Sequence, residues 1–156
     1  LAGPGTGLGP EGVATKARVI ADALRRVQSS ESKPLELLRR LGGRELAALA
    51  GAALAAEEIG ATILVDGFIV TSALYAAVLH RPSLRDHLLF AHRSGEPGHA
   101  RLLEALGADP LLDLGLRLGE ASGALTAYGL IELSCALHAE MSTFAEAGLD
   151  GAPEPA

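Results

Sequence analysis

Three features that the sequence lacks limit the kind of protein it can encode. The 156 residues contain a single cysteine, so no internal disulfide can form, which fits a reducing compartment. The longest uncharged stretches, such as residues 67–80, fall short of the roughly 18 residues that a membrane-spanning helix needs. Positive charge is also scarce, because 19 acidic residues outnumber 13 basic ones and leave a net charge of −6. A nucleic-acid backbone or an anionic membrane is therefore not expected as the main partner.

The beginning of the chain has neither a methionine nor a signal pattern of basic and then hydrophobic residues. It opens in a glycine-rich loop, Gly3-Pro4-Gly5-Thr6-Gly7-Leu8-Gly9. We therefore expect the C-terminal part of a longer protein. The apolar share of 49% is still ample for a buried core without disulfides or metals, and the length suits one domain.

Proline and glycine residues divide the chain into helical segments. Prolines suit the first turn of a helix and glycines its end, and between them apolar residues recur at three- and four-residue spacing. The expected helices cover residues 10–27, 34–41, 44–59, 68–80, a segment from 97 that Gly107 closes, and residues 120–147. The last segment is either one long helix or two that meet near Gly129. Its apolar residues predict that Cys135 is an inert thiol in the core.

Two short apolar segments between these helices have the pattern of buried parallel strands. Residues 61–65 precede an Asp-Gly turn, and residues 86–91 lead into His92-Arg93-Ser94. The order of helices and strands predicts an α/β fold over residues 1–149, with helices around a parallel, Rossmann-like sheet that the low strand count leaves incomplete. We expect the last helices to be able to join a small helical subdomain, and residues 150–156, rich in proline and alanine, to form a loose tail.

Glu120 is the leading candidate for a reacting group. It stands between glycines in Leu118-Gly119-Glu120-Ala121-Ser122-Gly123-Ala124, where a chain can present a general base. A carboxylate at a helix start is more commonly a cap or a partner of the helix dipole. Likewise, Asp66-Gly67 can be a plain turn, and residues 94–98 can be a loop that caps the next helix. The residues by themselves leave these alternatives open.

Three separated motifs resemble a single enzyme family. The motifs are Val65-Asp66-Gly67-Phe68, then Ala91-His92-Arg93-Ser94-Gly95-Glu96-Pro97-Gly98-His99, then Leu111-Leu112-Asp113-Leu114-Gly115-Leu116-Arg117-Leu118-Gly119-Glu120. Their order is that of the nicotinate-nucleotide:dimethylbenzimidazole phosphoribosyltransferases, and the resemblance runs from about Gly5 to about Gly148. It implies a pentosyltransferase of cobalamin biosynthesis that moves phosphoribose from nicotinate mononucleotide to 5,6-dimethylbenzimidazole. Nicotinate and α-ribazole 5′-phosphate would be the products, without a metal or cofactor, in a cytoplasmic homodimer.

The resemblance also implies roles for individual residues. Glu120 matches the catalytic base, and Ala121 stands where the family has glycine, which matters if the turn needs a positive φ. The other roles are binding positions: nucleotide at Asp66, Gly67 and Ser94, phosphate at Lys16 and the loop Gly5-Thr6-Gly7, and the flat base at Leu118.

Two other classes of protein stay open on the sequence. A nucleotide-binding module without catalysis would carry the same glycine loops and strand ends, and a helical interaction protein would explain the abundance of alanine. The five histidines fit no compact ligand set, so no metal site is expected. We expect His92 in the pocket wall beside Ser94.

Overall fold

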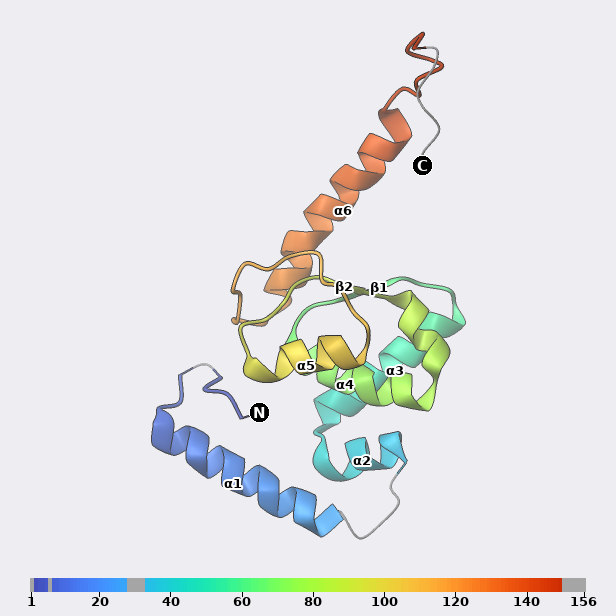
Figure 1. Ribbon diagram of the computed structural model, residues 1–156. Coiled ribbons are helices and arrows are strands. Elements are labelled where there is room, and N and C mark those ends of the chain that lie inside the picture. Colours follow the sequence, from blue (N-terminus) through green and yellow to red (C-terminus); the bar gives the residue numbers. More distant parts are fainter. Residues whose placement is uncertain (1, 6, 28–32, 150–156) are drawn as a thin grey trace.

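The computed structural model describes residues 2–5, 7–27 and 33–149 (Figure 1). Its elements follow in the order α1 (Pro10–Val27), α2 (Pro34–Leu41), α3 (Arg44–Glu58), β1 (Ile63–Val65), α4 (Phe68–His80), the 3-10 helix η1 (Pro82–His87), β2 (Leu88–Phe90), α5 (Pro97–Ala105) and α6 (Ser122–Glu140). The predicted bounds of α1 to α5 are confirmed within a residue or two: α1, α2 and α5 begin at prolines, and a glycine follows α2, α3 and α5 within two residues. Thr6 and the expected tail, residues 150–156, lie outside the described residues.

A small parallel sheet lies in the middle of the fold. β1 and β2 pair in register from Ile63 opposite Leu88 to Val65 opposite Phe90. Backbone hydrogen bonds of 2.7–3.0 Å then join residues 90–95 to residues 111–116. The predicted α/β fold is confirmed, because β1 and β2 pair in parallel among the helices. The sheet is small, since each of these two strands is three residues long.

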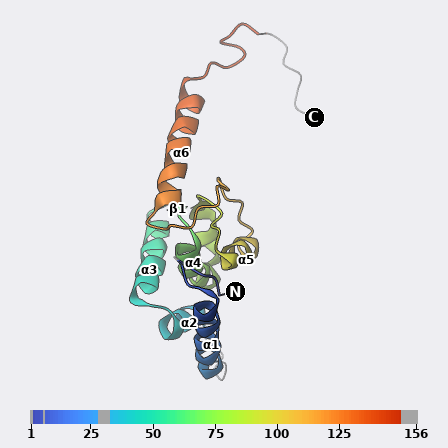
Figure 2. The ribbon, with the colours of Figure 1, turned by 90° about the vertical axis from the view of Figure 1, so that its left-hand side faces the viewer.

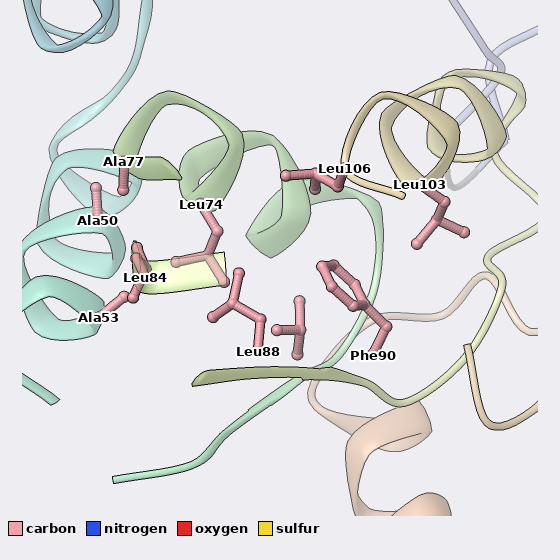
Figure 3. Packing of buried hydrophobic residues seen from close by; sticks show 10 residues of the cluster. Ala50, Ala53, Leu74, Ala77, Leu84, Leu88, Phe90, Leu103 and Leu106 are labelled. Carbon is pink, nitrogen blue, oxygen red and sulfur yellow. The ribbon is translucent and has the colours of Figure 1, made fainter. Parts of the chain in front are cut away.

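The core lies between this sheet and the helices α3, α4 and α5 (Figure 3). It contains Ala50, Ala53, Val65, Leu74, Ala77, Leu84, Leu88, Phe90, Leu103 and Leu106. The alanines of α3 allow it to pack closely on α4. Each large side chain that is fully buried stabilises the fold by about 1.5–3 kcal/mol. This core fixes the strand ends that carry the site.

The second strand begins later than the sequence predicts. Residues Pro82–His87 form the 3-10 helix, so the predicted strand start at Asp86 is wrong. Pro82 suits the first position of a helical turn, and the turn carries Leu84 into the core, where it is fully buried.

The last helix projects away from the rest of the molecule (Figures 1 and 2). α6 continues through Gly129, so the single-helix alternative is confirmed, although it is shorter than residues 120–147. Its apolar side chains are largely exposed, with Leu133 57% and Leu137 55% accessible, and Cys135 is exposed as well. The predicted core thiol is wrong, because apolar neighbours on a helix do not show whether another element covers them. In the described part of the chain, no helix combines the length and the apolarity needed to cross a bilayer.

Candidate functional site

A cavity of about 550 Å³ opens where β1 and β2 end. Segments far apart in the sequence line it: Gly5, Lys16, residues 66–70, His92, Ser94, Glu96 and residues 117–121. The structure therefore brings together Gly5, Lys16, Asp66, Gly67, Ser94, Leu118 and Glu120. Gly7 is not among the lining residues, and Thr6 lies outside the described ones.

Glu120 lies in a tight turn immediately before α6. The Ser122 N–H donates to the Gly119 carbonyl at 3.0 Å, and φ is 57° at Glu120 and 58° at Ala121. These are the signs of a type I′ turn, which needs positive φ at both central positions. Within the described residues, no hydrogen bond or ion pair engages the Glu120 carboxylate. The turn thus presents an exposed, unengaged carboxylate at the cavity.

Ala121 occupies a backbone conformation that favours glycine. Its φ of 58° and ψ of 16° lie in the left-handed region. A side chain there costs roughly 1–2 kcal/mol relative to the ordinary helical region. The sequence raised this question at Ala121, and the structure answers that the turn does need a positive φ. Backbone strain of this kind is found more often at active sites and ligand-binding sites than elsewhere in proteins.

Asp66 connects the end of β1 to the start of α6. Its Oδ1 accepts a hydrogen bond of 2.9 Å from the backbone N–H of Ala124, 58 residues later in the chain. The residue that precedes α6, Ala121, has no side chain able to cap the helix, so Asp66 caps it from another element. Its carboxylate also lies at the positive end of the helix dipole. The Glu120 turn is consequently attached to the sheet through Asp66.

His92 is a buried polar residue in the cavity wall, as expected from the sequence. It is 3% exposed, its Nε2 lies 3.9 Å from Asp66 Oδ1, and its Nδ1 is buried without a hydrogen-bond partner among the described residues. A methyl group on Gly123 would lie 1.9 Å from His92 Cδ2, and one on Gly67 would lie 3.1 Å from His92 Nε2. Glycine at both positions allows the imidazole to fit between β1 and α6.

The side of the cavity nearest the N-terminus carries Gly5 and Lys16. The Lys16 Nζ donates to the Gly3 carbonyl at 3.2 Å, which holds the lysine of α1 against the glycine loop. Arg117 also lines the cavity and was missed in the sequence analysis. Its position three residues before Glu120, in an acidic protein, was a signal that could have identified it.

Two further residues behind the cavity wall, Thr71 and His99, were also not predicted to act in the site. Both are fully buried, and the His99 ring contacts those of Phe68 and His92, each with centroids 6.3 Å apart. Burial lowers the pKa of His99 to about 4, and the neighbouring His92 and Arg93 act in the same direction. The ring is therefore neutral near pH 7. A threonine one helical turn into α4 carries no signal of this role in the sequence.

The cavity combines groups of opposite charge with apolar surface. The carboxylates of Asp66, Glu96 and Glu120 face the same space as the cations of Lys16 and Arg117. An anionic ligand with hydroxyl groups suits such a lining, and Phe68, Ile69 and Leu118 provide surface for a flat ring. The described residues contain no group of three or more His, Cys, Asp or Glu side chains placed to hold a metal ion.

The chain is similar over most of its length to known transferases. A sequence model of the phosphoribosyltransferase family matches residues 1–149. The nicotinate-nucleotide–dimethylbenzimidazole phosphoribosyltransferase of Azotobacter vinelandii is 58% identical over 149 residues, which are 96% of this chain and 42% of the relative. The corresponding Pseudomonas aeruginosa protein is 57% identical over 153 residues, 98% of this chain and 44% of the relative.

A solved structure agrees with these sequence matches. The crystal structure of CobT from Thermus thermophilus matches with a TM-score of 0.89 at 45% identity, covering 97% of this chain and 45% of that one. The chain thus spans less than half the length of the proteins it matches.

Proposed function

Because the chain belongs to this phosphoribosyltransferase family, we propose that it serves the transfer of phosphoribose from nicotinate mononucleotide to 5,6-dimethylbenzimidazole. The products are nicotinate and α-ribazole 5′-phosphate, the lower-ligand nucleotide of cobalamin. One observation carries the proposal. The unengaged carboxylate of Glu120 shares a cavity with Asp66, Gly67 and Ser94 at the ends of parallel strands.

Glu120 acts as the general base in this proposal. One benzimidazole nitrogen attacks the anomeric carbon of the ribose and forms a carbon–nitrogen bond. The bond to nicotinate breaks, and nicotinate leaves with its electron pair. The proton on the other benzimidazole nitrogen passes to Glu120. Attack opposite the leaving group inverts the anomeric centre, which converts a β-linked nucleotide into an α-linked one.

The other lining residues hold the two substrates. Asp66 and Gly67 bind the ribose, since a carboxylate accepts hydrogen bonds from hydroxyls and a glycine lets the backbone approach. Ser94 lies on the nicotinate side. Lys16 and the loop Gly5-Thr6-Gly7 bind phosphate, and the hydrogen bond from Lys16 to Gly3, two residues before this loop, supports this. Leu118, 70% exposed at the cavity mouth, covers the flat base.

We also propose that the enzyme works in the cytoplasm as a homodimer. The single cysteine fits a reducing compartment. The exposed leucines of α6 offer apolar surface for a second subunit or for a helical subdomain. Sedimentation of the purified enzyme at several concentrations tests the dimer, and a single monomeric species would contradict it.

The decisive experiment measures nicotinate release from nicotinate mononucleotide and dimethylbenzimidazole. It uses a full-length family enzyme in which this sequence occupies the region it matches. Glu120→Gln keeps the shape of the side chain but removes its basicity. We expect turnover to fall by about 100-fold or more, with little change in nucleotide affinity. Glu104→Gln, an exposed carboxylate on α5 outside the cavity, is the matched control and should leave turnover unchanged.

Other results would favour other functions. Nucleotide binding without nicotinate release in the unmodified enzyme would indicate a binding module without catalysis. Absence of both binding and release would favour the helical interaction protein. Normal turnover in the Glu120 variant would remove this residue from the mechanism.

A further inference from the structure

A chain of three hydrogen bonds, the hydrogen-bond relay, runs behind the cavity and joins two of its walls. The backbone N–H of Ser94 donates to His99 Nδ1 at 2.9 Å. His99 Nε2 lies 3.0 Å from Thr71 Oγ1, and Thr71 Oγ1 donates to the Gly67 carbonyl at 2.8 Å. The two ends, Ser94 and Gly67, both line the cavity, whereas Thr71 and His99 do not.

The direction of each hydrogen bond follows from the first one. Nδ1 accepts a hydrogen bond from the Ser94 amide, so the single proton of the neutral imidazole must be on Nε2. Nε2–H then donates to the threonine oxygen, whose own proton goes to the Gly67 carbonyl. All three bonds point the same way, from the Ser94 amide to the Gly67 carbonyl. The pKa of His99, lowered by burial to about 4, keeps the ring in the neutral form that this arrangement requires.

We propose that His99 is a positioning residue that, through Thr71, fixes the Ser94 loop relative to Gly67 in the geometry that binds the nucleotide. The inference rests on the proposed function, because it concerns the nucleotide side of that cavity. It adds two residues that touch no substrate. Gly67 lies two residues after β1 and Ser94 lies four residues after β2, both beyond the backbone hydrogen bond from the Ala91 N–H to the Val65 carbonyl. A protonated or absent ring would release the Ser94 amide.

The surroundings of His99 distinguish this role from simple packing. His99 lies in the first turn of α5. In the loop before this helix, the Glu96 N–H donates a hydrogen bond of 3.3 Å to Ser94 Oγ. The only polar contacts of the ring among the described residues are the two in the relay. An apolar residue of similar size would fill the space but would leave the Ser94 amide and the Thr71 hydroxyl without these partners.

Four variants separate the two halves of the relay. The amide oxygen of His99→Asn can reach the position of Nδ1 and keep the Ser94 bond, whereas His99→Gln can reach the position of Nε2 and keep the Thr71 bond. Thr71→Ser keeps the hydroxyl and Thr71→Val removes it. Leu103→Val, also on α5 and 1% exposed, is the control for a loss of packing alone.

Dissociation constants for nicotinate mononucleotide, turnover and thermal unfolding are measured for each variant in the full-length enzyme described above. We expect His99→Gln to weaken nucleotide binding about tenfold, His99→Asn and Thr71→Val between about threefold and tenfold, since each breaks the link through Thr71, and Thr71→Ser less than about threefold, by the usual scale of one buried hydrogen bond. Turnover at saturating nucleotide should change less than affinity. Leu103→Val should lower the unfolding temperature and leave affinity unchanged.

Two results with these variants would overturn the proposal. One is nucleotide affinity that follows the unfolding temperature across all variants, Leu103→Val included. The other is equal affinity in Thr71→Ser and Thr71→Val together with no difference between the two His99 variants.

Nitrogen NMR of the His99 ring tests the relay without relying on activity. A proton on Nδ1 would also overturn the proposal, even if the unmodified enzyme releases nicotinate normally. If the unmodified enzyme neither binds the nucleotide nor releases nicotinate, the proposed function fails. The position of the proton on the His99 ring is then the remaining test of the relay.

Discussion

Two apolar regions of this chain differ in how far their side chains are buried. α4 and the strands beside it bury one apolar face, where Leu74 and Ala77 are almost completely covered, although Leu79 at the end of α4 is 53% exposed. α6 has a similar supply of apolar residues but projects from the molecule with Leu125 70% and Leu133 57% exposed (Figure 1). The difference shows that apolar sequence predicts helix formation, whereas burial depends on whether another element covers the face. The candidate site lies where the two regions join.

The join itself is made by a few specific contacts. Asp66 caps the start of α6 through the Ala124 N–H, and Gly123 packs directly against the His92 ring. Glu120 therefore takes its position from the buried region although it belongs to the projecting one. Changes in either region, or at the join, test this view.

Truncation of a buried leucine should separate the two regions most strongly. Leu74→Ala opens a cavity in the core, and we expect the free energy of unfolding to fall by about 2–5 kcal/mol. Leu133→Ala removes the same atoms from exposed α6 and should change it by less than about 0.5 kcal/mol. Denaturant titration measures both. Similar losses would mean that α6 is covered in solution, for example by a second subunit.

Acid should weaken the buried region through His99. The folded pKa is about 4, below the ordinary value of 6.5, so the unfolded chain binds the extra proton first as the pH falls. The stability that the neutral ring provides is fully present above pH 6.5. It should be lost between pH 6.5 and about 4, by up to about 1.4 kcal/mol per pH unit.

His99→Asn serves as the comparison for this pH dependence. The difference between its denaturation curves and those of the parent isolates His99 from the carboxylates, such as Glu57 and Glu146, whose pKa values are lowered by hydrogen bonds. If the free energy of unfolding of parent and variant changes in parallel from pH 7 to pH 4, the pKa of His99 is not lowered by folding.

Removal of the cap at the join should have an intermediate effect. Asp66→Ala deletes the acceptor for the Ala124 N–H and should lower the free energy of unfolding by about 1 kcal/mol. Amide hydrogen exchange at the first turn of α6 should accelerate. Asp66→Asn keeps an oxygen acceptor but loses the charge at the helix dipole, so its loss should be smaller. Unchanged exchange in Asp66→Ala would show that α6 needs no cap from the sheet.

Relief of the strained turn should have the smallest effect, and an opposite sign. Ala121→Gly suits a φ of 58° and should stabilise the protein by about 0.5 kcal/mol, since relief of strain outweighs the greater freedom of glycine in the unfolded chain. Ala136→Gly, inside α6, is the control and should destabilise the helix by up to about 1 kcal/mol. Thermal unfolding measures both. A loss of stability in Ala121→Gly would contradict the left-handed conformation.

Much of the fold followed from local patterns. The prolines at residues 10, 34 and 97 and the apolar spacing after them predicted three helices, and short apolar segments predicted the strands. The start of β2 was misplaced because the burial of Leu84 in a 3-10 turn depends on the core, not on neighbours in sequence. The exposure of Cys135 was missed for the same reason.

The candidate site was predictable in part. Because parallel strands end at one edge, the positions of Asp66 and Ser94 near each other could be expected from the pattern. Their approach to Glu120 depended on the resemblance to a family. Arg117 left a weak signal as a basic residue in that motif. Thr71 and His99 left none, since their function depends on partners 28 and 5 residues away that only folding brings within reach.

The identity and spacing of neighbouring residues were enough to predict the helices, the short strands, the order of the motifs and the family. They could not show that Asp66 caps α6 through Ala124, 58 residues later, that Glu120 and Ala121 share a left-handed turn, or that a buried histidine joins two loops of the cavity. These features depend on packing between distant segments. Spacing along a chain cannot specify which distant groups a fold brings into contact.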